Sequence, residues 1–206
     1  GVEGGGGVKR GLFSGLSRQA RGDVVTSLLS LVVSMLVRSY VLEPRYIPSG
    51  SMAPTLQVGD KVLVDIITHR MPLARANKPN KPYQRRDVVV FTPPERYTQA
   101  RGSGGGGGSE ALIKRVVGVA GDLVEVRDRR LYVNGQLQQE SYTAELPDYS
   151  LAATTVPKGM LLVLGDNRNN SFDGHVWGLL PEGNVRGRAV CRFWPPWRAG
   201  CIEGSL

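Results

Sequence analysis

The sequence is poor in the residues that most often bind metals, because its 206 residues include only two cysteines and two histidines. His69 and His175 lie far apart, and no Cys/His spacing in the chain is typical of a zinc site. The sequence therefore predicts no bound metal, and we expect no cofactor of another kind.

The two cysteines, Cys191 and Cys201, flank a Trp-Pro-Pro-Trp segment near the end of the chain. They would form a disulfide if this part of the protein meets an oxidising compartment, but their spacing equally allows two free thiols. The sequence leaves both states open.

Acidic residues are fewer than basic ones, with 18 Asp and Glu against 26 Lys and Arg and a net charge of +8. The basic residues are spread along the chain and are not interleaved with aromatic residues in any nucleic-acid-binding motif. We therefore expect no nucleic-acid partner. Lys9, Arg10, Arg18 and Arg21 precede the first apolar run, an arrangement that follows the positive-inside rule of membrane proteins.

Long apolar runs are scarce, and the main one lies near the N-terminus. We predict a flexible basic tail over residues 1–22 and a transmembrane helix over 23–43, capped by Asp23 and ended by Pro44. At about 1.5 Å per residue, such a helix roughly spans a bilayer core. Its uncharged part, 24–37, is short, so Arg38 would have to reach toward the lipid headgroups.

A polar stripe allows a second interpretation of this helix. Ser27, Ser30, Ser34 and Arg38 recur on one face at helical spacing. The pattern also fits an amphipathic helix in the membrane interface, or a serine face packed on another helix. We favour the membrane span, which makes membrane lipid an expected partner. Because the chain begins with glycine, we also expect a fragment or processed product whose targeting peptide lies outside this sequence.

Beyond Pro48 the periodicity changes from that of a helix to that of short strands. Residues 123–136 predict a hairpin with Asn134-Gly135 at a turn, whereas 71–83 and 138–158 are predicted loops. The other predicted strands cover 61–67, 87–92, 111–119, 160–164 and 185–193. Short strands at such frequent intervals predict a mainly β, barrel-like domain over residues 44–206.

A glycine-rich stretch, 101–109, interrupts the predicted strands. It resembles an engineered linker, but Gly4 to Gly7 shows that glycine runs recur in this chain, so natural low complexity is an equal alternative. Its match to a dinucleotide-binding loop lacks the required strand-to-helix context. We expect a disordered hairpin extension that can be deleted without loss of function.

Ser51 and Lys114 are the candidate catalytic residues. A serine hydroxyl is a weak nucleophile that needs a base, and an amine can be that base only when it is neutral. Lys114 lies among Ile113, Val116 and Val117, so a strand could turn it into an apolar site that lowers its pKa from about 10.4. Taken singly, each residue fits a structural role, since Ser-Gly-Ser triplets commonly form turns and strand lysines are commonly solvated.

Three ordered motifs contain or follow these residues. They are Ser49-Gly50-Ser51-Met52-Ala53-Pro54-Thr55-Leu56, then Lys114-Arg115-Val116-Val117-Gly118 with Gly121-Asp122, then Gly165 to Asp173. Together they resemble the type I signal peptidases, over about residues 41–195. The form of Asn169 to Gly178 is most similar to the cyanobacterial and plastid branch, whose plastid members are called thylakoidal processing peptidases. The resemblance implies a signal-peptidase-like (LexA-like) antiparallel β-barrel, with a small inserted β-cap over 122–160.

The resemblance also implies a role for each matching residue. Ser51 would be the nucleophile, Lys114 the general base, and the Ser51 N–H with the Ser49 hydroxyl the oxyanion hole. Ser171 would orient Lys114, and Asp173 would pair with His175. The supporting residues implied around the dyad are Ser171, Asp173, His175, Gly165, Asp166 and Arg168. The implied substrate pocket is lined by Ile47, Met52, Leu56, Leu112 and Ile113.

The sequence departs from the family pattern at three positions, one of which is Leu112, at a position that is often aromatic. Gly174 stands where serine is most common, which should loosen its loop, and Arg86 stands where many members have glycine, which should affect only a turn. Asn169-Asn170-Ser171 also matches a glycosylation sequon, which we attribute to chance because a glycan would block the proposed site.

The implied function is that of a membrane-bound serine endopeptidase, which removes signal or thylakoid-transfer peptides from preproteins after small residues, at Ala-x-Ala sites. It would be a single-pass protein with its catalytic domain on the trans side of the thylakoid membrane; bacterial and mitochondrial inner membranes are alternatives. A Ser51–His175–Asp173 triad is the competing mechanism. The competing functions are a self-cleaving repressor-type Ser/Lys protease and a non-catalytic membrane-anchored β-module.

Overall fold

The computed structural model describes residues 18–66, 83–102 and 111–204. The chain divides into two compact units, Gly1–Tyr40 and Val41–Leu206, and each is described by itself. His69, the predicted loop over 71–82 and most of the predicted glycine-rich loop lie outside the described residues.

The first unit is a helix whose bounds differ from those we predicted. Helix α1 spans Arg18–Val41, so residues 18–22 are helical rather than part of a flexible tail. Asp23 lies inside the helix and does not cap it, because the good helix formers Arg18 to Arg21 extend the helix toward the N-terminus. Pro44 does not end the helix either, since it lies within the following strand.

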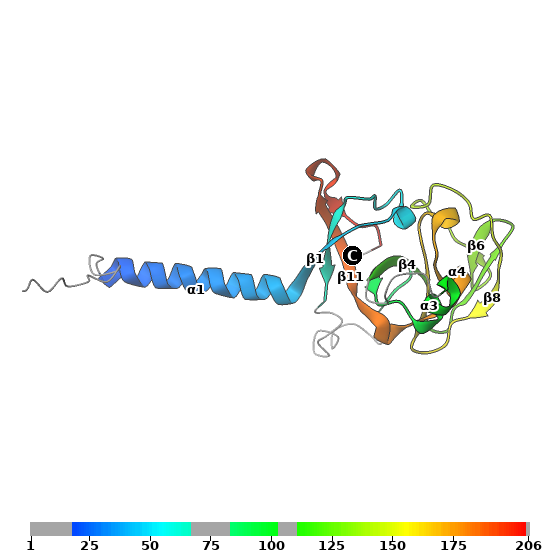
Figure 1. The fold of residues 1–206 in the computed structure, drawn as a ribbon, viewed down its shortest axis with the longest axis horizontal. Coiled ribbons are helices and arrows are strands. Elements are labelled where there is room, and N and C mark those ends of the chain that lie inside the picture. Colours follow the sequence, from blue (N-terminus) through cyan, green and yellow to red (C-terminus); the bar gives the residue numbers. More distant parts are fainter. Residues whose placement is uncertain (1–17, 67–82, 103–110, 205–206) are drawn as a thin grey trace, which may run out of the picture. The chain divides into compact units, whose positions relative to one another are not determined.

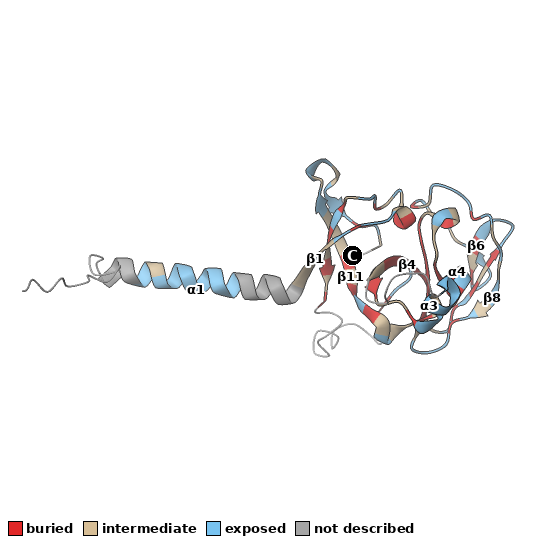
Figure 2. Cartoon of the chain, viewed as in Figure 1, coloured by how far each residue is buried: buried red, intermediate tan, exposed pale blue. Residues whose placement is uncertain are grey.

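Most of the apolar side chains described in α1, which fall within residues 24–33, are exposed (Figure 2). Val25, Leu28, Leu29, Leu31, Val32 and Val33 are each at least half exposed. A search of the described residues finds no helix of sufficient length and apolarity to cross a membrane.

The second unit is mainly β, as predicted, and its larger sheet is antiparallel (Figure 1). Its strand order is β1-β2-β11-β3-β4-β9-β10, and β12 pairs with β11. The strands are β1 (Leu42–Tyr46), β2 (Lys61–Asp65), β3 (Val88–Phe91), β4 (Leu112–Gly118), β9 (Met160–Leu164), β10 (Leu180–Pro181), β11 (Val185–Trp194) and β12 (Gly200–Cys201).

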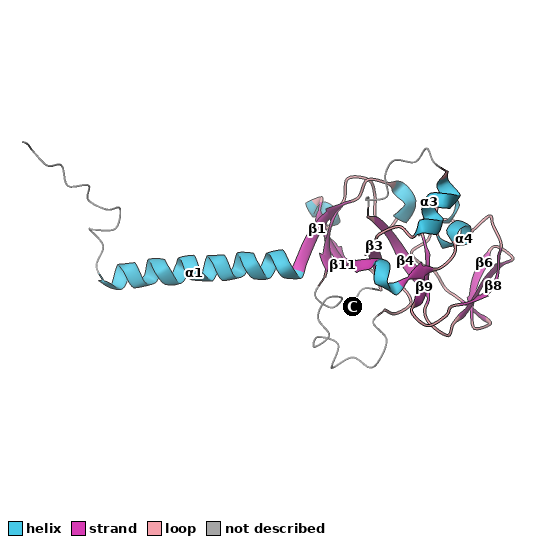
Figure 3. Cartoon of the chain, turned by 60° about the horizontal axis from the view of Figure 1, so that its bottom comes forward, coloured by secondary structure: helices cyan, strands magenta, loops and turns pink. Residues whose placement is uncertain are grey.

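A smaller antiparallel sheet, with the order β7-β6-β5-β8, lies at the end of this unit opposite β1 and β11 (Figures 1 and 3). Its strands are β5 (Leu123–Arg127), β6 (Arg130–Val133), β7 (Gln136–Leu137) and β8 (Leu151–Thr155). The two residues of each hairpin turn, Asp128-Arg129 and Asn134-Gly135, have positive φ. This conformation is favoured in two-residue hairpin loops.

The smaller sheet occupies most of the segment predicted as an inserted cap, 122–160, and Met160 already begins β9 of the larger sheet. Strand β8 was predicted as loop, which is wrong. Its residues are mostly exposed, so they lack an alternating apolar pattern, and pairing with β5 decides their conformation.

Both faces of the central strands are buried, which explains their continuous apolar sequences. In β3, Val88 and Val90 pack in one core cluster while Val89 and Phe91 pack in a second. The neighbouring β4 is buried from Ile113 to Gly118. A polar side chain on β4 is therefore carried into the interior whichever face it occupies.

Two short helices, α3 (Glu95–Arg101) and α4 (Gly174–Trp177), lie side by side (Figures 1 and 3). The ring centroid of Tyr97 in α3 is 6.5 Å from that of Trp177 in α4 and 5.3 Å from that of Phe172. We did not predict α3, and its last residue, Arg101, had been assigned to the glycine-rich loop.

Candidate active site

Ser51 lies in a 3₁₀ helix, Gly50–Met52, in the connection between β1 and β2. Its side chain is buried. The loop that follows β9 holds this turn, since Asn167 donates its backbone N–H to the Ser51 carbonyl (3.1 Å) and its side-chain Nδ2 to the Gly50 carbonyl (3.1 Å). Two segments distant in sequence thus determine the position of the serine.

Lys114 approaches Ser51 from the centre of β4, opposite Val89 of β3. Its Nζ lies 2.7 Å from the Ser51 Oγ and donates a hydrogen bond to the Ile113 carbonyl at 3.0 Å. Only 4% of the residue is exposed. The structure therefore brings together the two residues that the sequence predicted as a dyad.

Burial lowers the pKa of Lys114 from 10.5 to about 8. The negative charges of Asp173 and Asp166 oppose this change by favouring the ammonium form, but desolvation is the larger effect. At pH 8 about half of the amines are then neutral and able to accept a proton from the Ser51 hydroxyl.

The predicted oxyanion-hole groups lie next to the Ser51 hydroxyl. The Ser49 Oγ is 3.4 Å from the Ser51 Oγ, and Ser49 is exposed. Within the part of the chain that the structure describes, no hydrogen bond uses the Ser51 N–H, as is usual for a residue at the start of a helix. The Ser51 N–H can thus donate to a bound carbonyl oxygen, whereas the Ser49 hydroxyl would first exchange its hydrogen bond with the Ser51 hydroxyl.

Asp166 is held by a buried ion pair with Arg115, the residue after Lys114. Its carboxylate accepts two hydrogen bonds from Arg115, at 2.8 and 2.7 Å, and one from Thr55 at 2.6 Å. Both charged side chains are fully buried. We assigned no role to Arg115 from the sequence, although it stands within the Lys-Arg-Val-Val motif.

Gly165 is needed where the loop passes the serine. A Cβ added there would lie 2.5 Å from the Ser51 carbonyl oxygen and 2.2 Å from the Ser171 Oγ. Ser171 is therefore packed close to the site, but its hydroxyl has no hydrogen-bond partner among the described residues. The predicted hydrogen bond from Ser171 to Lys114 is absent, because the Lys114 amine bonds to Ser51 and Ile113 instead.

Asp173 caps α4 and pairs with His175, as expected. Its carboxylate accepts hydrogen bonds from the Gly165 N–H (2.7 Å) and the His175 N–H (3.2 Å), and the His175 Nδ1 lies at 2.8 Å. The His175 ring stacks on Tyr149, with 3.9 Å between centroids. The described hydrogen bonds of the Ser51 hydroxyl go to Lys114 and Ser49 and not to His175, so no triad is assembled.

Gly174 does not loosen its loop, contrary to our expectation. A Cβ at this position would lie 2.7 Å from the Val163 carbonyl oxygen, so the glycine allows α4 to pack directly on β9. The predicted supporting residue Arg168 donates to the Gly165 carbonyl (3.1 Å) and makes two hydrogen bonds to Glu140, at 2.7 and 2.6 Å.

A cleft of about 640 Å³ opens beside the Ser51–Lys114 pair. Of the five predicted pocket residues, Leu112 and Ile113 line it, whereas Ile47, Met52 and Leu56 are buried in the core. The complete lining is Pro48, Ser49, Gly50, Ser51, Tyr97, Arg101, Ala111, Leu112, Ile113, Lys114, Asn167, Asn170 and Phe172. Asn167, Asn170 and Phe172 lie in a motif we had singled out, but nothing in the sequence indicated Tyr97 and Arg101.

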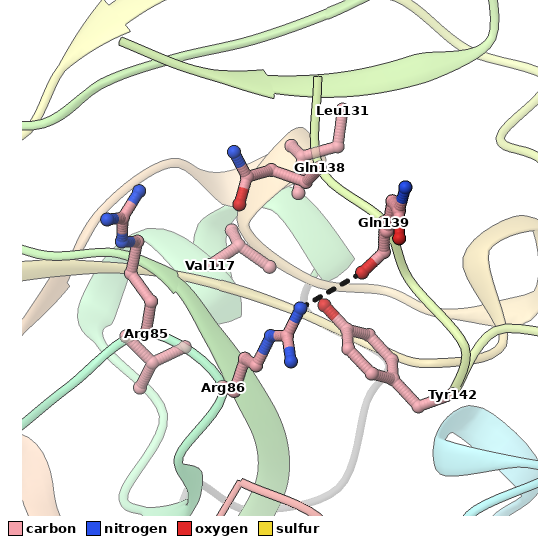
Figure 4. Close-up of a pocket in the computed structure, with 8 residues that line it drawn as sticks. Arg85, Arg86, Val117, Leu131, Gln138, Gln139 and Tyr142 are labelled. Carbon is pink, nitrogen blue, oxygen red and sulfur yellow. Dashed lines mark hydrogen bonds between the residues drawn. The ribbon is translucent and has the colours of Figure 1, made fainter. Parts of the chain in front are cut away.

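A second, smaller cavity of about 180 Å³ lies among residues of β4, β6 and the loops beside them (Figure 4). Arg86 crosses it and donates from Nη2 to the Gln139 carbonyl at 3.1 Å. Arg86 has a φ of 78°, a conformation that glycine adopts without strain. The arginine at this position therefore does more than alter a turn, since its side chain links the loop before β3 to the loop after β7.

A buried serine hydroxyl within hydrogen-bond distance of a desolvated lysine, at the edge of a cleft, is the arrangement required by serine hydrolases that use lysine as their base. The family model "Signal peptidase, peptidase S26" matches residues 21–194. The chain therefore belongs to the peptidase S26 family of signal peptidases, as its motifs predicted.

Individual relatives agree with this assignment. Signal peptidase I of Leptolyngbya laminosa is 44% identical over 172 residues, covering 84% of this chain and 78% of that protein. Probable signal peptidase I-1 of Synechocystis is 44% identical over 173 residues, covering 84% and 82%. Thylakoidal processing peptidase 1 of Arabidopsis thaliana is 41% identical over 177 residues, covering 84% of this chain and 48% of that protein. The predicted similarity to cyanobacterial and chloroplast members is confirmed.

Proposed function

We propose that this protein removes signal peptides from preproteins by acting as a serine endopeptidase with Ser51 as nucleophile and Lys114 as general base. The observation that carries the proposal is the 2.7 Å contact between the Ser51 Oγ and the Lys114 Nζ, in a buried site beside a cleft. Membership of the signal peptidase family defines the reaction as hydrolysis of a peptide bond.

In the first step, the neutral Lys114 amine takes the Ser51 proton while the Ser51 oxygen attacks the scissile carbonyl. The Ser51 N–H and the Ser49 hydroxyl stabilise the resulting oxyanion, and one such donor is typically worth about 10²–10³ in rate. The negative charges of Asp173 and Asp166 favour the ammonium form of Lys114, which then protonates the leaving amine. Lys114 next activates the water that releases the acyl group from Ser51.

The lining of the cleft supports a preference for small side chains in the substrate. Leu112 and Ile113 form an apolar wall next to the nucleophile, and the Tyr97 and Phe172 rings stand in edge-to-face contact on the α3 side. Such a wall excludes water from the scissile bond and suits alanine-sized residues, in keeping with cleavage after Ala-x-Ala.

The proposed location is a thylakoid membrane, with the catalytic unit on the trans side and α1 as the membrane attachment. The relatives named as thylakoidal processing peptidases and the exposed apolar side chains of α1 support this proposal. Full-length protein is expected to stay in the membrane pellet after alkaline carbonate extraction. Release into the supernatant would favour a helix that lies in the membrane interface.

Cleavage of a preprotein with an Ala-x-Ala site tests the dyad. Ser51→Ala and Lys114→Ala should each reduce cleavage by several orders of magnitude, and the double variant should be no worse than either, because members of one catalytic unit are not additive. His175→Ala is the matched control and should keep substantial activity. A His175→Ala protein as inactive as Ser51→Ala would favour the triad, and a wild type that cleaves no preprotein would favour a non-catalytic module.

A further inference from the structure

The two cysteines face each other across an antiparallel pair of strands. Cys191 of β11 is the direct partner of Cys201 of β12, and Arg192 is the partner of Gly200. The connection between these strands runs from Pro195 to Ala199 and contains a short 3₁₀ helix, Pro196–Arg198. The fold thus places the two cysteines next to each other, which the sequence alone did not predict.

The hydrogen bonds of this ladder show which kind of pair the cysteines form. The Ile202 N–H donates to the Val190 carbonyl at 3.0 Å, so Val190 and Ile202 are a hydrogen-bonded pair. Because the two kinds of pair alternate along an antiparallel ladder, Cys191 and Cys201 are a non-hydrogen-bonded pair, whose Cα atoms lie about 4.5 Å apart. A disulfide needs a Cα separation of about 4.4–6.8 Å, so it requires no rearrangement of the strands.

The cysteines lie on the side of the ladder that solvent can reach. Directly paired residues point to the same face, and Ile202 is buried in the core, so the next pair along points away from the core. Cys201 is exposed and Cys191 is partly buried. Cys201 is therefore the more accessible thiol for the first exchange step. Burial and the neighbouring Cys201 both raise the pKa of the Cys191 thiol.

We propose that Cys191 and Cys201 are a redox site that forms a reversible disulfide, and that this bond clamps the C-terminal segment 200–204 onto the catalytic unit. The oxidant is a low-molecular-weight disulfide such as oxidised glutathione. The Cys201 thiolate attacks it, releasing one glutathione thiolate and leaving a mixed disulfide. The Cys191 thiolate then attacks the Cys201 sulfur and releases the second glutathione. Overall, the two protein thiols give two protons and two electrons to one glutathione disulfide, which becomes two glutathione thiols, and the protein gains one disulfide.

The clamped segment supports the residue next to the proposed base. The Glu203 carbonyl accepts a hydrogen bond from the Arg115 Nη1 at 2.6 Å, and its side-chain carboxylate accepts one from Ser141 at 3.1 Å. The Arg115 Cζ also lies 4.0 Å from the ring centroid of Tyr142, which lines the cavity in Figure 4. A Cβ on Gly204 would lie 2.5 Å from the Arg86 carbonyl oxygen, so the segment fits tightly there.

Strand β12 is only two residues long, and beyond it the segment is held by the buried Ile202 side chain and by the hydrogen bonds of Ile202 and Glu203. Without a cross-link, a segment held by so short a strand can open locally without unfolding of the whole unit. A disulfide would remove the open conformations, and the Arg115–Glu203 hydrogen bond would persist. The predicted effect is therefore on stability and local opening, and not on the chemical step.

The experiment compares the full-length protein in detergent after equilibration with oxidised or reduced glutathione. After oxidation we expect no thiols available for maleimide labelling, a monomeric chain on a non-reducing gel, and a Tm higher by about 5 °C. The Ile202 and Glu203 amides should exchange hydrogen more slowly in the oxidised form. These readouts do not depend on peptidase activity, so they can fail or succeed independently of the proposed function.

Single-cysteine variants are the matched controls. Cys191→Ser should retain one glutathione on Cys201, because the second exchange step is blocked, and neither Cys191→Ser nor Cys201→Ser should gain stability on oxidation. Two thiols that still react with maleimide after oxidation, or a cross-link between two chains, would overturn the redox site. An intramolecular disulfide that leaves the Tm and the exchange of Ile202 and Glu203 unchanged would overturn the clamp.

Discussion

At the scale of single residues, the reactivity of the site depends on the environment that sets the protonation state of the Lys114 amine. Apolar neighbours on β3 and β4 remove water from the amine, and this desolvation outweighs the attraction of Asp173 and Asp166. The same two carboxylates are themselves engaged in hydrogen bonds with Gly165, His175, Arg115 and Thr55. Their charges therefore stay in place to stabilise the ammonium ion that forms during the reaction.

The pH dependence of kcat/KM for a soluble peptide should reflect this lowered pKa. Since the neutral amine is the active form, activity should rise with pH through about 8 and fall about tenfold for each pH unit below it. The measurement is a profile from neutral to alkaline pH on the full-length protein. If the midpoint of the acidic limb of the profile lies near 10.5, the ordinary pKa of lysine, Lys114 is not desolvated.

Ser171 gives a second prediction at this scale. Its hydroxyl makes no hydrogen bond to Lys114, so Ser171→Ala should leave the midpoint of the acidic limb unchanged. The comparison is the pH profile of the variant against that of the wild type. A shifted midpoint in kcat/KM would indicate that Ser171 contacts the amine in the free enzyme, as the family resemblance implies.

At the scale of elements, the loop between β9 and α4 positions the serine of the site. Its Asn167 holds the Ser51 turn, its Asp173 caps α4, and its Gly165 passes against the Ser51 carbonyl. The nucleophile therefore stays in line with Lys114 only while this loop keeps its close approach.

Gly165→Ala should disturb that approach, because its Cβ would lie within 2.5 Å of the Ser51 carbonyl oxygen. A displacement of about 1 Å at a catalytic residue can lower the rate about 10²-fold, and we expect a loss of this size in kcat/KM. Gly183→Ala is the matched control, since a Cβ there meets no atom within 4 Å. Equal activity in the two variants would show that the loop can move without affecting Ser51.

At the scale of the whole catalytic unit, Arg115 connects segments from most of the sequence. Its guanidinium bonds to Asp166 after β9, to the Arg86 carbonyl before β3 and to the Glu203 carbonyl in the C-terminal segment. A buried charge with this many partners is costly to leave unpaired.

Arg115→Met should lower stability by about 3–5 kcal/mol, because it leaves the Asp166 carboxylate buried without its ion pair. This corresponds to a decrease in Tm of roughly 10 °C in a protein of this size. Arg129→Ala, which removes an exposed ion pair with Asp148, should change the Tm very little. Similar Tm changes in the two variants would mean that the buried Arg115–Asp166 pair contributes no more to stability than the exposed Arg129–Asp148 pair.

The sequence by itself determined the family, the β class and most strands of the larger sheet. Strand β9 has the predicted bounds, Met160–Leu164, and β11 differs from its prediction by one residue. Strand β9 is a continuous apolar run, and β11 begins with alternating buried and more exposed residues, so both patterns are local and can be recognised without knowing their neighbours. The Ser51 and Lys114 motifs are local in the same sense.

Only the tertiary structure decided which residues meet. Three features of the site depend on which strands are neighbours. Ile47, Met52 and Leu56 pack in the core, and Tyr97 and Arg101 line the cleft. Arg115 lies beside Asp166. The register of β11 and β12 likewise places Cys191 opposite Cys201. Contacts between distant segments follow from strand order and register, which a pattern read along one chain does not contain.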